Sequence, residues 1–155
     1  MADLEISNLS FSFGANKPLV IDDICAVFKG GEITAVIGRN GGGKTTLLKS
    51  IARLLKASGK VSLTAPNGKK LSKSDIAYVP QLSQVNSKLT VFEMVLLGLV
   101  SDLKWRVSPE QSQRVEAVLA ELSLTELARY PLSGLSGGQK QLVFLAQAFV
   151  SRPKA

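Results

Sequence analysis

A glycine-rich segment that ends in a lysine and two threonines could bind phosphate groups. Residues 38–46 read GRNGGGKTT, which fits the pattern G-x-x-x-x-G-K-[ST]. Glycines let the backbone curl until successive N–H groups point at one anion. In such a loop Lys44 can reach the β- and γ-phosphates of a nucleotide, and the Thr45 hydroxyl can ligate Mg²⁺. The segment therefore predicts a nucleotide phosphate site, against the alternative of a glycine turn that matches by accident.

The sequence on either side of this loop predicts the elements that would position it. Residues 32–37 are an apolar, β-branched run of strand length, and residues 47–55 carry leucine and isoleucine at helical spacing. We expect the strand to be buried. We expect the helix to run to about Lys56, with Gly59 as its C-cap. The helix N-terminus would add about half a positive charge beside the phosphates.

A second glycine pair, preceded by a serine, occurs late in the chain. Residues 135–139 read LSGGQ. Ser136 can cap the helix that follows and Gln139 stands three residues later, which is the capping-box arrangement. Gly137 and Gly138 keep side chains away from the helix start, so its amides are open to an anion. Taken alone, the segment could also be a capped helix after a glycine turn.

The remaining pattern predicts an α/β frame with a helical insertion. Thr90 and Ser108 are expected N-caps, Pro109 occupies a first helical position, and the last helix is apolar enough to be buried on most sides. We place a core with an antiparallel β subdomain at 1–88, a helical part at 89–134, and a return to the core at 135–155. The expected strands are 3–13, 21–28, 32–37, 61–63 and 75–81, and the expected helices are 47–56, 91–99, 109–122 and 140–150.

Composition fits one globular domain of the cytoplasm. The 155 residues are 45% hydrophobic, and no segment is apolar enough to span a bilayer. The first residues lack the basic-then-apolar order of a signal peptide. The single cysteine, Cys25, is expected to be a buried core residue. The net charge of +7 suggests nucleic acid as one alternative, but the basic residues are scattered, so we favour a solvated surface and expect no nucleic-acid partner.

Together these segments resemble the ATP-binding cassette ATPases, the motor subunits of ABC transporters. The resemblance covers essentially the whole chain. Residues 38–46 match the Walker A loop, and residues 135–139 are the family's signature motif. Gln81 matches the Q-loop glutamine, which in the family contacts Mg²⁺ or water and couples to the membrane subunit. Phe13 stands where the family places an aromatic ring that stacks on adenine; the alternative is a core residue of the first strand.

The resemblance implies a role for each matching residue. Lys44 and Gln81 are expected to be catalytic, and Thr45 and Gln81 to ligate Mg²⁺. The residues expected to bind ATP are Phe13, Gly38, Asn40, Gly41, Gly43, Lys44, Thr45, Thr46, Ser136, Gly137, Gly138 and Gln139.

The fold implied by the resemblance is a P-loop NTPase: a RecA-like core with an antiparallel β subdomain and an inserted helical subdomain, incomplete at the C-terminus. The implied function is to bind MgATP and, in the full-length protein, to hydrolyse it and drive transport, with import favoured. The implied partners are a second cassette packed head to tail and transmembrane permease subunits, at the inner face of the cell membrane. Residues 89–99 resemble importers of the iron-siderophore and cobalamin type.

After residue 151 the family pattern calls for an apolar strand ending in the Walker B aspartate, then a catalytic glutamate and a switch histidine. None follows, and the chain has no histidine. A truncated gene or partial sequence, a fragment, and a partner that completes the sheet would each explain this. We expect negligible turnover from the 155 residues alone. Two alternative functions stay open: a soluble ABC ATPase, and a non-catalytic nucleotide-binding or regulatory module.

Overall fold

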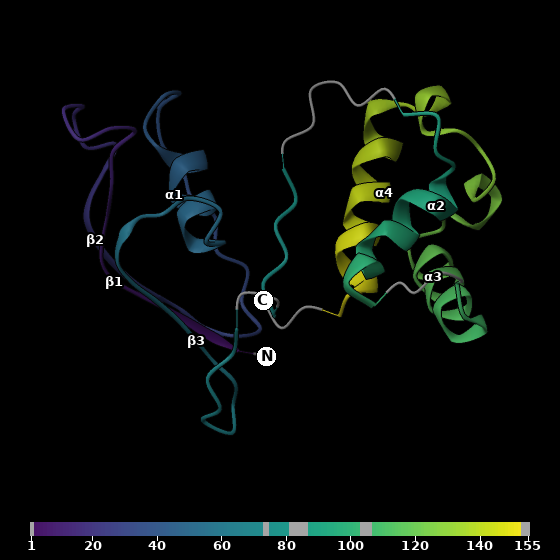
Figure 1. The fold of residues 1–155 in the computed structure, drawn as a ribbon, viewed down its shortest axis with the longest axis horizontal. Coiled ribbons are helices and arrows are strands. Elements are labelled where there is room, and N and C mark those ends of the chain that lie inside the picture. The colour runs from purple at the N-terminus through teal and green to yellow at the C-terminus, as the bar shows by residue number, and fades with distance from the viewer. Residues whose placement is uncertain (1, 73–74, 81–86, 103–106, 153–155) are drawn as a thin grey trace. The chain divides into compact units, whose positions relative to one another are not determined.

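The chain folds into two compact units, one within residues 2–78 and the other within residues 79–152. The computed structural model describes residues 2–72, 75–80, 87–102 and 107–152. The first unit combines strands with one helix, and the second is helical (Figure 1). Each unit is described by itself. The domain boundaries expected near residues 88 and 134 stay predictions.

A three-stranded antiparallel sheet in the order β2-β1-β3 forms the first unit. Its apolar side packs around Leu4, Ile6, Leu9 and Leu63, all buried. The alternation of buried residues along β1 changes phase between Ile6 and Leu9, because the register with both neighbouring strands shifts there, as at a β-bulge. The expected strands 3–13, 21–28 and 61–63 are confirmed. Their bounds are β1 Asp3–Phe11, β2 Ile21–Phe28 and β3 Ser58–Thr64.

Helix α1, Lys44–Ile51, follows the glycine loop and packs on this sheet through Leu47 and Ile51. It ends earlier than expected. Arg53 adopts a left-handed conformation with φ 54° just after it, and its Nη2 donates to the Val61 carbonyl at 2.7 Å. Gly59 is therefore not a helix cap, as the sequence had suggested. It lies in β3, where a Cβ atom would collide with the Asn8 carbonyl.

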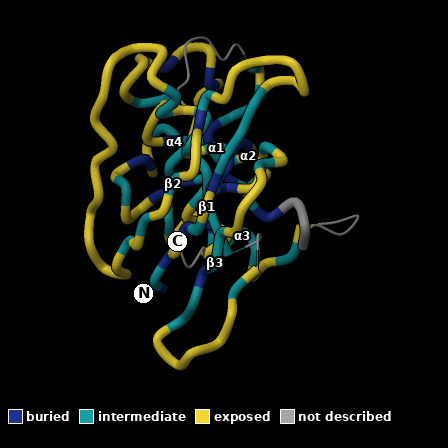
Figure 2. Tube along the Cα trace, turned by 90° about the vertical axis from the view of Figure 1, so that its left-hand side faces the viewer, coloured by how far each residue is buried: buried dark blue, intermediate teal, exposed yellow. Residues whose placement is uncertain are grey.

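Within the described residues, neither of the two further expected strands forms. Residues 33–40 and 76–80 pair with no strand, and the expected buried strand 32–37 is exposed, Ile33 at 102% and Ile37 at 91%. The reason is that a buried strand needs hydrogen-bonded neighbours. Within the described residues, the only strands that pair are β1, β2 and β3. Figure 2 shows how burial varies along the chain.

Cys25 also differs from the expectation of a buried core residue. It is exposed on β2, and the Asn8 backbone N–H donates to its sulfur at 3.2 Å. On β2 the half-buried positions are Ile24, Ala26 and Phe28, so the residues between them face outward. The prediction of a buried Cys25 is wrong because the residues around it are apolar on both faces of the strand, so the sequence does not indicate which face each residue occupies.

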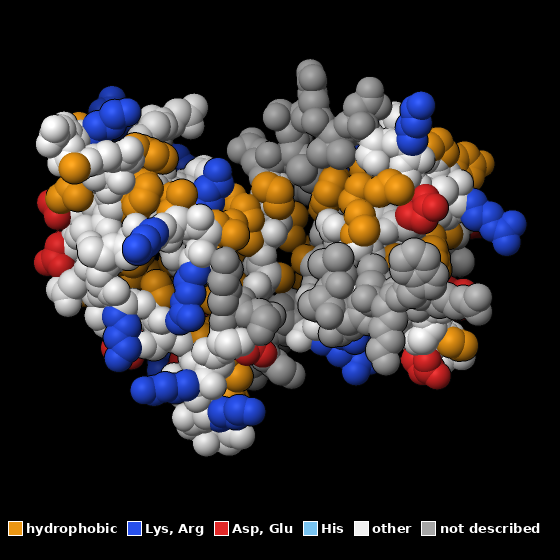
Figure 3. Space-filling view, in the orientation of Figure 1, with side chains coloured by type: hydrophobic (Ala, Val, Ile, Leu, Met, Phe, Trp, Pro, Cys, Tyr) orange, Lys and Arg blue, Asp and Glu red, His pale blue; other side chains and the backbone are white. Residues whose placement is uncertain are grey.

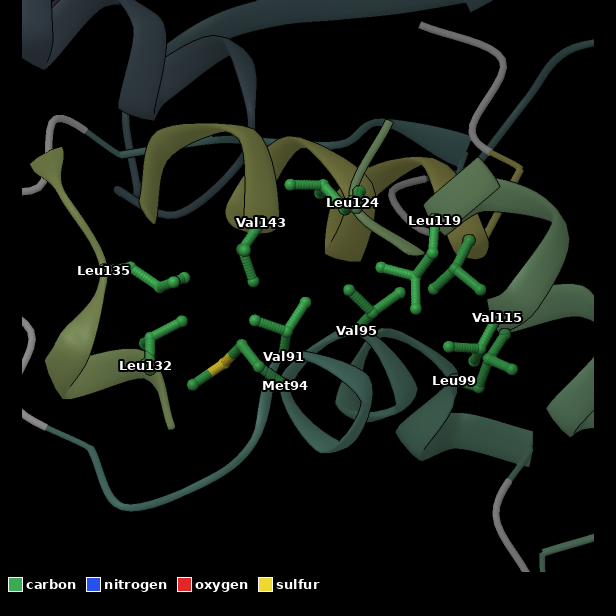
Figure 4. Close-up of a cluster of buried hydrophobic side chains, with 12 residues drawn as sticks. Val91, Met94, Val95, Leu99, Val115, Leu119, Leu124, Leu132, Leu135 and Val143 are labelled. Atoms are coloured by element: carbon green, nitrogen blue, oxygen red, sulfur yellow. The ribbon is translucent and has the colours of Figure 1, made fainter. Parts of the chain in front are cut away.

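The second unit is a small helical cluster around a continuous apolar core (Figure 4). Helices α2, α3 and α4 contribute Val95, Val115 and Val143 to this core, all fully buried. The expected caps Thr90 and Ser108 are confirmed, each in a capping box. The elements are α2 Val91–Leu96, η2 Leu97–Asp102, α3 Pro109–Glu121, η3 Thr125–Leu127, η4 Leu132–Gly134 and α4 Gly137–Val150.

Helix α4 buries one face rather than most sides. Val143, Ala146 and Val150 are buried, whereas Leu142 and Phe149 are 40% and 43% exposed. The helix itself is confirmed, and the expected burial is wrong for its outer side.

Charged side chains are dispersed on the face of the molecule that Figure 3 shows. On the face drawn in Figure 3, Lys and Arg side chains of the unit that holds the sheet lie in separate spots between apolar and polar atoms. Within the part of the chain that the structure describes, no helix has the length and apolar character needed to cross a membrane.

Candidate functional site

The start of α1 leaves backbone amides free for an anion. Gly43 is its N-cap residue, with φ 80°, and no side chain caps the helix. In contrast, α2, α3 and α4 each begin with a capping box. Because the first N–H groups of a helix have no partner within it, an uncapped N-terminus presents donors and a partial positive charge to a phosphate.

Backbone conformation favours glycine at two positions of the loop, and a close backbone approach requires it at one of them. Gly41 and Gly43 both have φ +80°, which L side chains rarely adopt. A Cβ atom on Gly43 would also lie 2.9 Å from the Val20 carbonyl oxygen, whereas one on Gly41 would meet nothing within 4 Å. The loop therefore rests against Val20, and its outer side is open.

Lys44 is held at this loop by the loop's own backbone. Its Nζ donates to the carbonyls of Gly38 and Arg39, at 2.7 Å each. Two carbonyl acceptors keep the ammonium over the loop, with donor capacity left because an ammonium has three N–H groups. This arrangement places a cation beside free amides, as the sequence pattern requires of a phosphate site.

Thr45 and Thr46 follow as the first turn of α1. Thr45 is exposed, and its hydroxyl makes no hydrogen bond with the described residues, so it is free to take a ligand. Asn40 is likewise exposed on the loop. No cluster of three or more His, Cys, Asp or Glu occurs among the described residues. One hydroxyl beside a triphosphate suits Mg²⁺, which keeps several waters and binds through substrate phosphates.

Phe13 lies just after β1 and is 61% exposed. Its ring meets that of Phe11 edge to face, with centroids 5.0 Å apart and planes at 86°. A chain of contacts joins this pair to the phosphate loop. The Val20 N–H donates to the Phe11 carbonyl at 2.8 Å, and the Val20 carbonyl lies against Gly43. Sequence reasoning missed Val20, because only the folded hairpin brings it to the loop.

The LSGGQ segment is anchored at one end and open at the other. Leu135 is buried in the helical core (Figure 4), whereas Ser136, Gly137 and Gly138 are exposed. Cβ atoms on the two glycines would meet nothing within 4 Å, so the space over the start of α4 is clear. The Ser136 hydroxyl accepts from the Gln139 N–H at 3.3 Å, and the Gln139 side chain accepts from the Ser136 N–H at 2.9 Å.

This capping box changes what the segment can offer to a ligand. The amide of Gln139 is already bonded, so the amides of the two glycines are the free donors at this helix end. The expectation that the whole helix start is open holds for these two positions only.

The segment before LSGGQ is fixed to the start of α2 by backbone hydrogen bonds. The N–H groups of Val91 and Phe92 donate to the carbonyls of Tyr130 and Ala128, at 3.0 and 2.9 Å. Glu93 completes the capping box at the start of α2. Its carboxylate accepts hydrogen bonds from the Thr90 N–H and, with a smaller effect, from the Thr90 hydroxyl, and both lower the pKa of the Glu93 carboxyl. The same few residues thus define both the start of α2 and the approach to the signature segment.

The predicted site residues fall into two groups. The loop residues and Phe13 lie together in the first unit, and Ser136 to Gln139 lie in the second. Gln81 lies outside the described residues, so its expected catalytic and metal-binding roles stay predictions.

The sequence matches the protein-family model described as "ABC transporter" over residues 21–155. It is 38% identical to the zinc transport system ATP-binding protein TroB of Treponema pallidum, over 95% of this chain and 56% of TroB. It is 33% identical to the iron(3+)-hydroxamate import ATP-binding protein FhuC of Bacillus subtilis, over 92% of this chain and 56% of FhuC.

Among solved structures, a nucleotide-free ATP-binding cassette from an ABC transporter matches with a TM-score of 0.81 and 28% identity. The match covers 99% of this chain and 66% of that structure. The chain thus spans less than two thirds of the length of each of these proteins.

Proposed function

The chain belongs to the ABC transporter family, and we propose that it binds ATP on the loop of residues 38–46 as the ATP-binding part of a transporter. Its fold class is that of its structural neighbours, a P-loop NTPase cassette. In the whole protein this binding would support ATP hydrolysis that drives transport.

The observation that carries the proposal is the uncapped start of α1 with an ammonium held over it. Gly43 offers no side chain to the helix amides, and Lys44 is tied to the loop by two carbonyls at 2.7 Å. A triphosphate would add acceptors to the free amides and to the remaining donor of Lys44. Each hydrogen bond of this charge-assisted kind is worth roughly 1.5–3 kcal/mol.

The proposed roles follow from these positions. The amides of Gly41 and of Gly43 to Thr46 hold the phosphates, Lys44 binds the β- and γ-phosphates, and Phe13 stacks on the base. The Gly42 N–H already donates to the Arg39 carbonyl at 3.1 Å. The Thr45 hydroxyl would hold Mg²⁺, which when bound neutralises charge on the phosphates. For Gln81, which lies outside the described residues, the family resemblance alone supports a role beside the metal.

We propose that the signature segment acts on a second cassette. The free amides of Gly137 and Gly138 would bind the phosphates of ATP held on the loop of a partner copy, with Ser136 and Gln139 fixing the helix start. This arrangement implies a head-to-tail dimer of cassettes. In such a dimer ATP would lie between the two cassettes. We propose that the dimer works beside permease subunits at the inner face of the membrane.

The proposed cargo is a metal ion or a metal chelate, taken up into the cell. Two relatives support this class of cargo, since the name of one specifies zinc transport and that of the other iron(3+)-hydroxamate import. The cassette itself would not contact the cargo.

The test is calorimetric titration of the 155-residue chain with MgATP. Lys44→Ala should weaken binding by roughly 10- to 100-fold, the loss of one charge-assisted hydrogen bond or slightly more. Lys49→Ala is the matched control, because it removes the same charge from the last turn of the same helix. It should leave the affinity within about twofold.

An equal loss of MgATP affinity in Lys44→Ala and Lys49→Ala would mean that the nucleotide is attracted by a basic surface in general, and would contradict the proposal. Phosphate release from the same material should stay near background, because we propose that these residues bind ATP without completing its hydrolysis. Ordinary family-like turnover would contradict that part alone.

A further inference from the structure

Phe11 and Phe13 form an aromatic pair on the hairpin that contacts the phosphate loop. Their edge-to-face geometry, with centroids 5.0 Å apart and planes at 86°, is one that ring quadrupoles favour. In such a pair one ring presents only its edge, so at least one face of Phe13 stays clear of Phe11. Phe13 is also 61% exposed. It is therefore a ring supported on one side and accessible on another.

The backbone around Phe13 is fixed by a compact set of hydrogen bonds. The Ser12 hydroxyl oxygen lies 2.8 Å from each of the Gly14 and Lys17 carbonyl oxygens, so its one O–H is shared between these two acceptors. The Lys17 N–H donates to the Gly14 carbonyl at 3.0 Å. The freedom that remains is rotation of the Phe13 side chain. Among the described residues, Phe11 is the one aromatic ring that contacts it.

Phe11 also joins this ring to the phosphate loop. Its carbonyl accepts from the Val20 N–H at 2.8 Å. The Val20 carbonyl in turn packs against Gly43, closely enough that a Cβ there would lie at 2.9 Å. The residue that supports the exposed ring is thus part of the same hydrogen-bonded segment as the residue that supports the loop.

We propose that Phe11 is a positioning residue for the nucleotide base. Its ring holds Phe13 in the orientation that stacks on adenine, and so reduces the side-chain freedom that stacking would otherwise remove. The inference rests on the proposed function, since it assumes ATP on the loop. The link from Phe11 to Val20 runs through its backbone carbonyl, which a side-chain substitution keeps. The effect of the Phe11 ring is therefore confined to Phe13 and the base and does not reach the phosphates.

The experiment compares ATP with tripolyphosphate, which lacks the base, by calorimetry in the presence of Mg²⁺. Phe11→Leu should weaken ATP binding by about 2- to 10-fold, the range expected for losing one aromatic pair. Tripolyphosphate binding should not change. Phe11→Tyr, which keeps the ring, should bind both ligands like the unmodified chain. Adding Phe11→Leu to Phe13→Leu should cost nothing beyond Phe13→Leu alone.

A merely structural role for Phe11 would give a different pattern. It would weaken ATP and tripolyphosphate binding alike, or act additively with Phe13→Leu, and either result would overturn the inference. If Phe11→Leu does not fold by circular dichroism, Phe11→Met serves as the second ring-free variant. Lys44→Ala separates the two proposals: ATP binding that depends on Lys44 but not on the Phe11 ring overturns this inference alone. ATP binding that is absent, or that does not depend on Lys44, overturns both.

Discussion

Alanine substitutions at two loop glycines should have unequal costs, because only one of them rests on the hairpin. Gly43 and Gly41 share φ +80°. A Cβ on Gly43 would lie 2.9 Å from the Val20 carbonyl oxygen and 3.3 Å from its Cγ1, and a Cβ on Gly41 would meet nothing within 4 Å. The pair therefore isolates one steric contact at a constant backbone conformation.

The magnitudes follow from the two terms. A left-handed alanine costs about 1–2 kcal/mol, reduced by roughly 0.4–1 kcal/mol because the unfolded chain also loses freedom. Gly41→Ala should thus lower the free energy of unfolding by about 1 kcal/mol. The clash with a backbone carbonyl, which cannot rotate away, adds about 1–3 kcal/mol. Gly43→Ala should lower it by about 2–4 kcal/mol.

The assay is urea unfolding followed by circular dichroism, with hydrogen exchange of the β1–β2 hairpin to assign the change to the first unit. The reasoning requires unchanged denaturant slopes and a lower midpoint for Gly43→Ala than for Gly41→Ala. Equal midpoints would refute it, since the loop would then not rest on Val20. A lower midpoint for Gly41→Ala would refute it as well.

Three further predictions concern stability. Gly98→Ala should lower the free energy of unfolding in urea by about 1–3 kcal/mol or more, because the added Cβ would meet a backbone carbonyl of α4. Gly134→Ala should leave the free energy of unfolding almost unchanged, because the added Cβ would lie in open space. Arg53→Gly should be more stable than Arg53→Ala by about 1 kcal/mol: both lose the bond to Val61, but only glycine relieves the left-handed backbone. The Thr90 N–H, and after it the Thr90 hydroxyl, lower the pKa of the Glu93 carboxyl below its usual 4.5. Because these bonds favour the ionised carboxylate in the folded chain, they stabilise the fold above that pH, and this stability is lost as pH falls through the lowered pKa. Glu93→Gln should remove this part of the pH dependence in thermal melts from pH 7 to 3; an unaltered profile would contradict the assignment.

Local sequence signals predicted the helix starts well. Thr90, Ser108 and Ser136 are N-caps, as the sequence predicts, and each forms a capping box, including Thr90, for which only a cap was expected. These signals work because both partners of a box lie within four residues of each other. The glycine loop was predictable for the same reason. These features need only a short stretch of chain to form.

Features that depend on distant partners were predicted less well. The run at 32–37 has strand composition but no neighbour to pair with among the described residues, so it stays outside the sheet. Cys25 was assigned to the wrong face of its strand. Val20 and Phe11 gained their roles at the site from contacts that no local pattern contains.

The four α-helices of the part of the chain that the structure describes differ in one respect that bears on function. The three in the second unit are capped by side chains, whereas α1 begins at a glycine that offers none. A glycine at the N-cap costs only about a few tenths of a kcal/mol relative to serine or threonine, and Gly43 could not be replaced by serine without a clash at Val20. The start of α1 is thus less stable than a capped helix would be, and an anion bound to its amides would supply the missing hydrogen bonds. By the same reasoning the start of α4, where Ser136 already satisfies one amide, has fewer donors to offer. This suits the role that we propose for it, which is to close a site held mainly by the loop of a second cassette.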